Sequence, residues 1–282
     1  MQNLPESPLS ASAILGAGAR LGLSVFGKLF LVTTALALVQ FIPTLVLAPR
    51  FGNGVVTPQE MLSVQFNGPM FLLQLACLLA LLLIQAVALT RLDNLATGVA
   101  TGYPGEIRRG LRVFPSLVGA FLLSLLIGIA AMILAGAIGA LIGLLGALLF
   151  GKLGFVVLLI LVMLVMMFYV VMYLMFVQYS IVLEESGPIR AINRSFNLVY
   201  GHWWHAFVVL ILGVLCLVAI AIVGAVAMSP LLLMTGSSDT GRSFFVSGVV
   251  QMTASAVLDP FILSVIYMLY RDLKLRSQLS VS

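Results

Sequence analysis

His202 and His205, the only two histidines of the chain, lie three positions apart in the stretch GHWWHAF. Side chains at this spacing share one face of a helix, so their imidazoles could bind one metal ion. A zinc site needs three or four nitrogen, sulfur or oxygen ligands. The nearest acids, Glu184 and Glu185, fall on the far side of a predicted surface helix. The ligand set is therefore incomplete, and we assign no metal.

The two tryptophans between these histidines, Trp203 and Trp204, favour a different interpretation. Tryptophan concentrates at the headgroup level of membranes, where its ring is apolar and its N–H is hydrated. We expect both to be interfacial anchors at an elbow where a surface helix turns into a membrane span. Tyr267 and Tyr270 are expected to anchor the end of the last span, with a docking tail for a partner as the alternative.

Asp259 is an acidic residue expected deep inside a span. It precedes Arg271 by twelve residues, which places it about 18 Å from the membrane boundary at a rise of ~1.5 Å per residue. A charged Asp at that depth costs about 2.5–3.5 kcal/mol, and Pro260 removes a backbone hydrogen bond beside it. Asp259 is either a proton or cation site, or a protonated acid that bonds a neighbour such as Gln85 or Thr34.

Catalytic motifs are missing from the chain. It has no GxSxG, HExxH, GxxxxGK[ST] or CxxC motif and no pair of carboxylates within a predicted span. A nucleophile, a base and oxyanion donors therefore cannot be assembled from named residues. We expect a protein that is not an enzyme and that uses no cofactor.

The composition is typical of a membrane protein. Hydrophobic residues make up 62% and charged residues 8% of the 282 residues, whereas soluble domains carry about 25% charged residues. The formal charge of +5 would favour nucleic acid as the partner of a soluble protein. Here it indicates basic loops that face anionic lipid, and no nucleic-acid partner is expected.

Six stretches meet the requirement of about 20 mostly apolar residues for a spanning helix. They are approximately residues 27–48, 68–90, 116–138, 154–179, 204–229 and 246–270. Of the 14 basic residues, the segments that would face outward hold only Arg50, Lys152 and Arg242. By the positive-inside rule, we expect both termini in the cytoplasm.

The apolar run 116–151 is too long for one span. As a single helix it would extend about 54 Å, against a hydrocarbon core of about 30 Å. We predict a break after about residue 138, because Gly136, Gly139, Gly143 and Gly146 recur every three or four residues. The same spacing makes a stripe of small residues that lets another helix approach closely.

Basic amphipathic segments precede the third and fifth predicted spans. Within residues 104–114, Ile107, Leu111 and Phe114 share one helical face. Within residues 187–200, Ile192, Phe196 and Val199 do so. Both segments are too short and too basic to span, and we expect each to lie in the headgroup layer with its apolar side down.

The arginines of these segments are candidates to bind the phosphates of anionic lipids. They are Arg108, Arg109 and Arg112 in the first segment, and Arg190 and Arg194 in the second. They could equally do no more than set the topology.

The two segments also match each other at an offset of 82 residues. The matched pairs are Gly105/Gly187, Ile107/Ile189, Arg108/Arg190, Arg112/Arg194 and Phe114/Phe196. Each segment precedes two predicted spans, and residues 9–25 form a weaker counterpart before the first two. We predict three parallel units, each a surface helix followed by a hairpin of two spans. Such repeats occur in transporters and also arise when duplication simply builds a bundle.

The order of these elements, with RSFNLVYGHWW before the fifth span and YMLYRDLKLR at the end, resembles a known family. It is similar to the YciC-like inner-membrane proteins of bacteria and to the membrane domain attached to some glycerophosphodiester phosphodiesterases. The resemblance implies a six-span protein of the bacterial inner (plasma) membrane. Family members commonly carry a Pro-Gly turn between the third and fourth spans, where this chain has its glycine-rich run. No phosphodiesterase catalytic domain is attached, so that activity is not implied.

The expected fold is all-α, a single membrane domain over residues 1–282 with six transmembrane helices in three hairpins and amphipathic helices on the cytoplasmic face. The leading hypothesis is a non-enzymatic membrane protein that engages anionic lipids or a membrane protein partner, which could be a second copy of the chain. The competing hypothesis is a proton- or cation-coupled transporter of a small molecule or lipid that uses Asp259.

Overall fold

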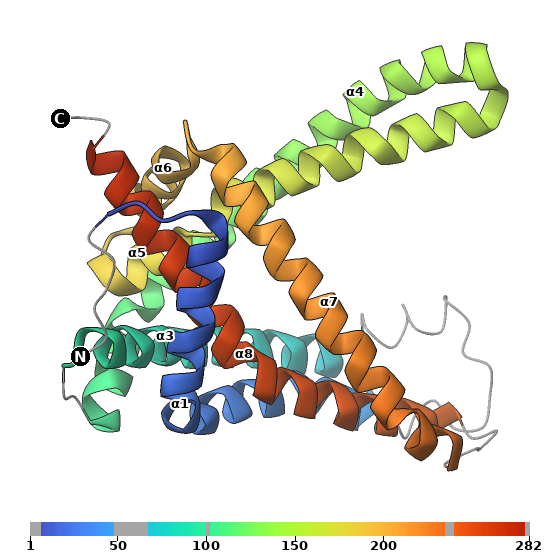
Figure 1. Ribbon diagram of the computed structural model, residues 1–282. Helices are drawn as coiled ribbons and strands as arrows, with labels where there is room; N and C mark the ends of the chain where they lie inside the picture. The colour runs from blue at the N-terminus through green and yellow to red at the C-terminus, as the bar shows by residue number, and fades with distance from the viewer. Residues whose placement is uncertain (1–6, 48–66, 100–101, 235–239, 280–282) are drawn as a thin grey trace. The chain divides into compact units, whose positions relative to one another are not determined.

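The computed structural model describes residues 7–47, 67–99, 102–234 and 240–279, and the regular secondary structure in these ranges is helical (Figure 1). The helices are α1 (Ala11–Leu47), α3 (Gly68–Thr97), α4 (Tyr103–Leu174), α5 (Val177–Glu184), α6 (Pro188–Val199), α7 (Trp203–Met234) and α8 (Thr240–Leu279). The all-α class is confirmed.

Five helical stretches of the described residues are long and apolar enough to cross a membrane, as expected of a membrane protein. They are Ala11–Val46, Gly68–Thr97, Tyr103–Glu184, Trp203–Ile220 and Val246–Leu279. The spans predicted at 116–138 and 154–179 both fall in the third of these stretches.

A single glycine reverses the direction of α4. Gly151 has φ 68 and ψ −158, a positive φ that glycine adopts without steric cost, and it divides α4 into an outgoing and a returning limb. Figure 1 shows the two limbs side by side, in green and yellow-green. The break predicted after about residue 138 is therefore at Gly151. The glycines before it remain helical, because a helix in apolar surroundings must satisfy its own backbone groups.

The glycine stripe of α4 faces its returning limb. A Cβ on Gly143 would lie 2.9 Å from the ring of Phe155. One on Gly146 would lie 2.7 Å from the carbonyl oxygen of Gly154, whereas Gly136 meets nothing within 4 Å. The stripe thus provides the close approach that its spacing predicts.

Three predicted boundaries differ from the structure. The predicted segments 9–25 and 27–48 fall in one helix, α1 (Ala11–Leu47), which changes direction part-way along (Figure 1); residue 48 lies outside the described residues. Residues 104–114 continue through Pro115 into α4, so they form no separate surface helix. The fourth predicted span ends at Leu174, and the short helix α5 follows it. Residues 187–200 do form a separate helix, α6, close to the predicted bounds.

The chain divides into two compact units, each described here by itself. The first contains Met1–Phe114 with Trp204–Ser280, and the second contains Pro115–Trp203. In the first unit α1 and α8 run antiparallel along each other, and glycines bring them close. A Cβ on Gly18 would lie 2.7 Å from the Cα of Val265, and one on Gly248 would lie 2.5 Å from the ring of Phe41.

A residue of α1 compensates for the backbone hydrogen bond that the proline inside α8 removes. Pro260 has no N–H to donate to the carbonyl one turn back, which is that of Ala256. The hydroxyl of the fully buried Thr33 of α1 donates to that oxygen at 3.2 Å and shares its proton with the carbonyl oxygens of Phe30 and Leu29, at 3.2 and 3.3 Å. The contact between the two helices therefore supplies a hydrogen bond that α8 cannot make alone.

We predict that Gly18→Ala destabilises the protein by about 1–3 kcal/mol, because the added methyl group collides with the backbone of α8. The matched control is Gly16→Ala in the same helix, where a Cβ meets nothing within 4 Å. That change should be neutral or stabilising by up to about 1 kcal/mol, since alanine is the better helix former. Unfolding in mixed detergent and SDS micelles measures both. Equal effects of the two substitutions would contradict this packing.

Candidate functional site

Arg91 joins three helices of the first unit. Its Nη1 donates to Glu106 Oε2 of α4 at 2.9 Å, and its Nε donates to the carbonyl oxygen of Lys28 in α1 at 2.7 Å. The guanidinium also lies 3.8 Å from the ring centroid of Tyr103, within cation–π range. The side chain of Glu106 is only 2% exposed, so this ion pair is largely withdrawn from water.

A second cluster joins α3 to α8. The buried hydroxyl of Tyr267 donates to Asp93 Oδ1 at 2.7 Å, and Arg271 Nη2 lies 3.5 Å from the same oxygen. Tyr267 and Tyr270, predicted as interfacial anchors, are 0% and 2% exposed. They therefore face the protein interior, where their rings fill the core.

A third cluster surrounds Asp272, which is fully buried near the end of α8. Its Oδ2 accepts from Arg276 Nε at 2.7 Å and lies 3.1 Å from His205 Nε2 at the start of α7. Its Oδ1 accepts from the backbone N–H of Leu9 at 2.7 Å, and Arg276 also donates to the carbonyl of Leu9 at 2.6 Å. The cluster binds the N-terminal segment to the last helix.

Sequence reasoning missed these three carboxylates. Each buried or half-buried acid has an arginine within 3.5 Å, as expected when an unpaired buried charge is costly. Only the spacing of Asp272 and Arg276, four residues apart, gives a signal that could have been read from the sequence. The other partners come from different helices, and no local pattern points to them.

The surface helix α6 packs into the second unit through one face. Ser195 donates its hydroxyl to the carbonyl of Tyr173 at 2.5 Å, and the ring of Phe196 stacks on that of Tyr173 with centroids 4.7 Å apart. Arg194 forms an ion pair with Glu184 at 2.6 Å. Arg190 is exposed. Ile192 and Val199, expected to face the membrane, are instead buried in the protein, because the apolar side of α6 packs on the chain itself.

The equivalent segment at the start of α4 packs against α3. A Cβ on Gly110 would lie 3.0 Å from the Val87 side chain. Ile107 and Leu111 are 45% and 54% exposed, and Arg108 is exposed beside them. These apolar residues, expected to lie against the membrane, do face outward from the protein.

Burial repeats between the two segments as their sequences do. At the offset of 82 residues, three buried positions of α4 are matched by buried positions of α6, and exposed positions of α4 are matched by exposed ones, although the buried Glu106 corresponds to the half-buried Pro188. The buried pairs are Gly110/Ile192, Val113/Ser195 and Leu117/Val199, and the exposed pairs are Ile107/Ile189, Arg108/Arg190 and Arg112/Arg194. Both segments thus present one face to the protein and an arginine-bearing face outward.

The predicted elbow lies between α6 and α7. Gly201 has φ 83, and the N–H of His202 donates to the carbonyl of Val199 at 3.0 Å. In the second unit Trp203 contacts Tyr169, with ring centroids 6.3 Å apart. Trp204 is 72% exposed, as a side chain at the membrane interface would be.

No metal site is formed by the part of the chain that the structure describes, since no group of three or more His, Cys, Asp and Glu side chains comes together there. His205 instead pairs with Asp272 in the first unit, and His202 belongs to the second unit.

Asp259 lies in none of the three charged clusters. Its Oδ2 is buried and has no hydrogen-bond partner among the described residues, and the same holds for Thr34 Oγ1. The bond between Asp259 and Thr34 considered from the sequence is therefore not formed.

Together the long apolar helices and the arginine-bearing helix ends define a polytopic helical membrane protein. The chain belongs to the family described as a domain of unknown function, DUF7847, whose model matches residues 9–273. No curated protein and no solved structure matches the chain.

We predict that Arg91→Met destabilises the protein by about 3–5 kcal/mol, because it removes the guanidinium that lies 2.9 Å from the buried carboxylate of Glu106. The double variant Arg91→Met with Glu106→Leu should recover most of that loss, since a buried pair replaced by apolar residues is often neutral. Arg20→Met, at an exposed position of α1, is the charge-matched control. Thermal unfolding in detergent measures all three. A double variant as unstable as the single one would contradict a pairwise role.

Proposed function

We propose that this chain is a non-enzymatic, multi-pass protein of the bacterial inner membrane that binds anionic lipid headgroups through Arg108 and Arg190. One observation carries the proposal. These two arginines occupy equivalent positions of the repeat, both are exposed, and neither has an ion pair or hydrogen bond among the described residues. Each follows an exposed isoleucine, Ile107 or Ile189, so an apolar group and a cation reach outward together.

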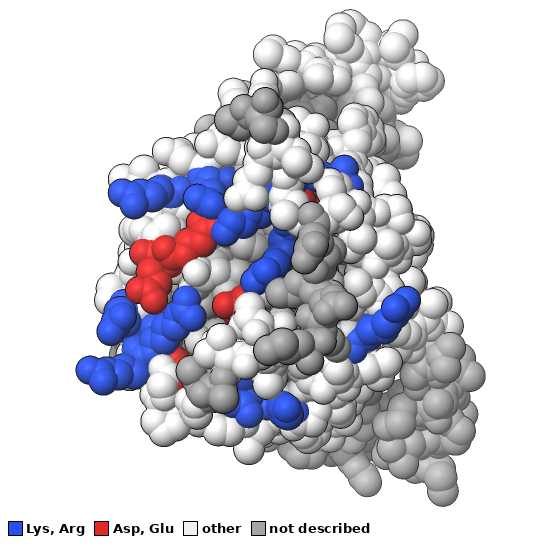
Figure 2. Space-filling model, turned by 60° about the vertical axis from the view of Figure 1, so that its left-hand side comes forward, with Lys and Arg blue, Asp and Glu red and all other residues white. Residues whose placement is uncertain are grey.

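Four other arginines are less available for lipid. Arg91, Arg271 and Arg276 are bound to carboxylates of the first unit, and Arg194 is bound to Glu184. Figure 2 shows acidic side chains among the basic ones, while most of the remaining visible surface is uncharged. This mixture supports membrane engagement rather than the continuous basic surface of a nucleic-acid-binding protein.

The proposed topology has six spans as three hairpins, with both termini in the cytoplasm. The reversal at Gly151 supports counting α4 as two spans. The contacts of Leu9 with Asp272 and Arg276 support an even number of spans, because they bring the two ends of the chain together. The basic ends of these helices support a cytoplasmic orientation. This architecture also supports a relationship to the YciC-like proteins and to the phosphodiesterase-associated membrane domains.

A second candidate function is a proton- or cation-coupled transporter of a small molecule or lipid. The specific observation that favours it is the buried carboxylate oxygen of Asp259, which has no partner among the described residues. Lipid binding through the surface segments does not require Asp259, so the variant Asp259→Asn separates the two functions.

We predict that Arg108→Gln and Arg190→Gln each weaken the binding of phosphatidylglycerol about fivefold, because a basic residue near an anionic surface contributes about 1 kcal/mol. Native mass spectrometry of delipidated protein, titrated with that lipid in neutral detergent, gives the apparent Kd. In the double variant, the apparent Kd should rise by the product of the two single-variant factors.

The control is Lys152→Gln, which removes the same charge at an exposed residue next to the reversal of α4. It should leave the affinity unchanged. If Lys152→Gln weakens lipid binding as much as the arginine variants do, the lipid is attracted only by the net charge of the protein. If the double arginine variant binds like the unchanged protein, specific headgroup binding is excluded, and a protein partner or second copy becomes the next hypothesis.

A further inference from the structure

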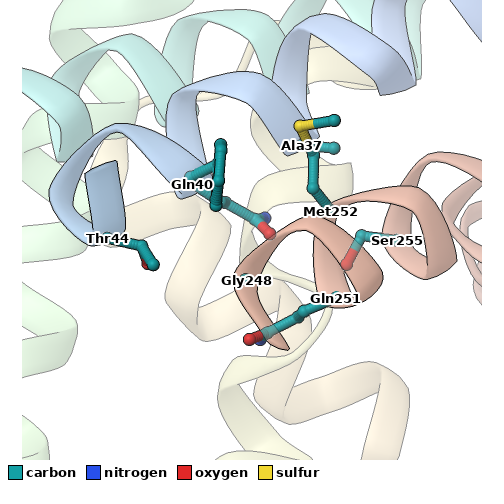
Figure 3. Close-up of a pocket in the computed structure, with 8 residues that line it drawn as sticks. Ala37, Gln40, Thr44, Gly248, Gln251, Met252 and Ser255 are labelled. Atoms are coloured by element: carbon teal, nitrogen blue, oxygen red, sulfur yellow. The ribbon is translucent and has the colours of Figure 1, made fainter. Parts of the chain in front are cut away.

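A polar cavity lies between α1 and α8, within the first unit. It offers about 100 Å³ of space for water and is lined by Gln40 and Thr44 of α1 and by Gln251 and Ser255 of α8. Figure 3 shows Gln40 extending from α1 toward α8. A cavity of about 10–15 Å³ holds one water molecule if polar partners are present. This cavity therefore has room and hydrogen-bonding groups for several.

The cavity lies far from the charged ends of the helices. Ser255 and Gln251 precede Arg271 by sixteen and twenty residues, or about 24 and 30 Å along a helix. The hydrocarbon core is about 30 Å thick. The cavity is therefore at the membrane face opposite the three charged clusters of Arg91, Arg271 and Arg276, here called the arginine clusters. Amide side chains at that depth are stabilised by water or by a polar partner.

The polar lining continues inward on both helices. Thr34 lies one turn before the cavity-lining Ala37 in α1, and Asp259 lies one turn after Ser255 in α8. These two residues carry buried oxygens without a hydrogen-bond partner among the described residues. Buried polar atoms of this kind are commonly satisfied by ordered water. Water that fills the cavity would need to advance only about 6 Å, one helical turn, to reach Asp259.

The opposite end of the α1–α8 contact is closed. A Cβ on Gly22 would lie 2.9 Å from the ring of Phe261, and one on Gly18 would lie 2.7 Å from the backbone of Val265. The backbones approach too closely there for a water file between them. Along the contact of α1 with α8, Asp259 is therefore open only toward the cavity.

The charged groups of α1, α3 and α7 do not neutralise Asp259. Arg91 and Asp93 of α3 belong to the arginine clusters, and His205 of α7 belongs to the cluster at the end of α8. Lys28 of α1 is exposed. None of them forms a described ion pair with Asp259, so its carboxyl is left to protons and water.

We propose that the cavity is the mouth of a water-filled half-channel that opens on the membrane face opposite the arginine clusters and ends at Asp259. A hydronium ion entering through the cavity transfers its proton to the Asp259 carboxylate and leaves a water molecule, and the reverse step returns the proton to the same face. This inference goes beyond lipid binding and does not depend on it.

The first test measures whether the cavity contains water. In a background with Cys77→Ala and Cys216→Ala, Ser255→Cys and Thr44→Cys place a thiol in the cavity. Val257→Cys places one two residues away on an apolar position that is 41% exposed and that we expect to face hydrocarbon. The protein in nanodiscs is treated with a permanently charged methanethiosulfonate, whose sulfur is attacked by the thiolate, forming a disulfide and releasing methanesulfinate. The cavity cysteines should react at least about tenfold faster, because only the thiolate reacts and hydrocarbon suppresses ionisation.

The second test measures proton binding at Asp259. Dicyclohexylcarbodiimide reacts with a protonated carboxyl. The carboxyl oxygen bonds to the carbodiimide carbon, the proton moves to a carbodiimide nitrogen, and the adduct rearranges to a stable N-acylurea. Peptide mass spectrometry should find this adduct at Asp259 in acidic buffer, much less of it in alkaline buffer, and none in Asp259→Asn. If the cysteine of Ser255→Cys is first modified with the methanethiosulfonate, the carbodiimide labelling of Asp259 should change more slowly after the buffer pH is changed.

Two results would overturn the proposal. Equal reactivity at Ser255→Cys, Thr44→Cys and Val257→Cys, including no reaction at any of them, would mean that no hydrated cavity exists. Carbodiimide labelling of Asp259 that does not change with pH, or that is absent at every pH, would mean that its carboxyl exchanges no proton. Neither result bears on phosphatidylglycerol binding, so lipid engagement stands or fails separately.

Discussion

The burial of Asp272 is the constraint on which much of the first unit depends. Its carboxylate has no exposure to solvent, and an unpaired charge in such a place is costly. Arg276, the backbone of Leu9 and His205 meet it from three parts of the chain. The requirement to neutralise one side chain thus brings the beginning of α1, the beginning of α7 and the end of α8 to one place. The pairs around Glu106 and Asp93 do the same for α3 and the start of α4.

The second constraint is that apolar surroundings offer the backbone no hydrogen bonds. Where α8 loses one at Pro260, the hydroxyl of Thr33 supplies it from α1. Where α4 must reverse, Gly151 does so in one residue, and the helix continues on either side. Glycines then take the place of bulky side chains wherever two helices approach closely, as in the α4 hairpin and along the contact of α1 with α8. Close packing of this kind is what associates helices in lipid, where no hydrophobic force acts between them.

Three charged side chains without an ion pair among the described residues lie at notable positions. Arg108 and Arg190 are exposed at equivalent positions of two segments that share both a sequence pattern and a pattern of burial. Asp259, in contrast, is an unpaired acid inside a span and lies one turn from a polar cavity. Because the carboxylates of Glu106, Asp93 and Asp272 are neutralised by arginines, the unpaired Arg108, Arg190 and Asp259 are available for interactions with lipid, water or protons.

The sequence by itself determined the class of the protein and the composition of its helices. The low charge and the long apolar runs allow only membrane-spanning helices, because lipid leaves a backbone no other way to satisfy its polar groups. Periodicity also determined the arginine-bearing faces of the two surface segments and the glycine stripe, since these are local patterns along one helix. The elbow before the fifth predicted span follows from the same local information, whereas its positive φ at Gly201 came from the structure.

The tertiary structure alone decided which charged side chains form ion pairs with one another. Nothing near Arg91 in the sequence indicates Glu106 of α4 as its partner, and the interior position of Tyr267 depends on Asp93 of α3. Nor could the sequence choose Gly151 over Gly136 or Gly139 as the point of reversal, because each glycine permits a positive φ. Only the packing of one limb on the other selects among them. A single helix determines which side chains share a face, but a contact between distant residues exists only once several helices have packed together.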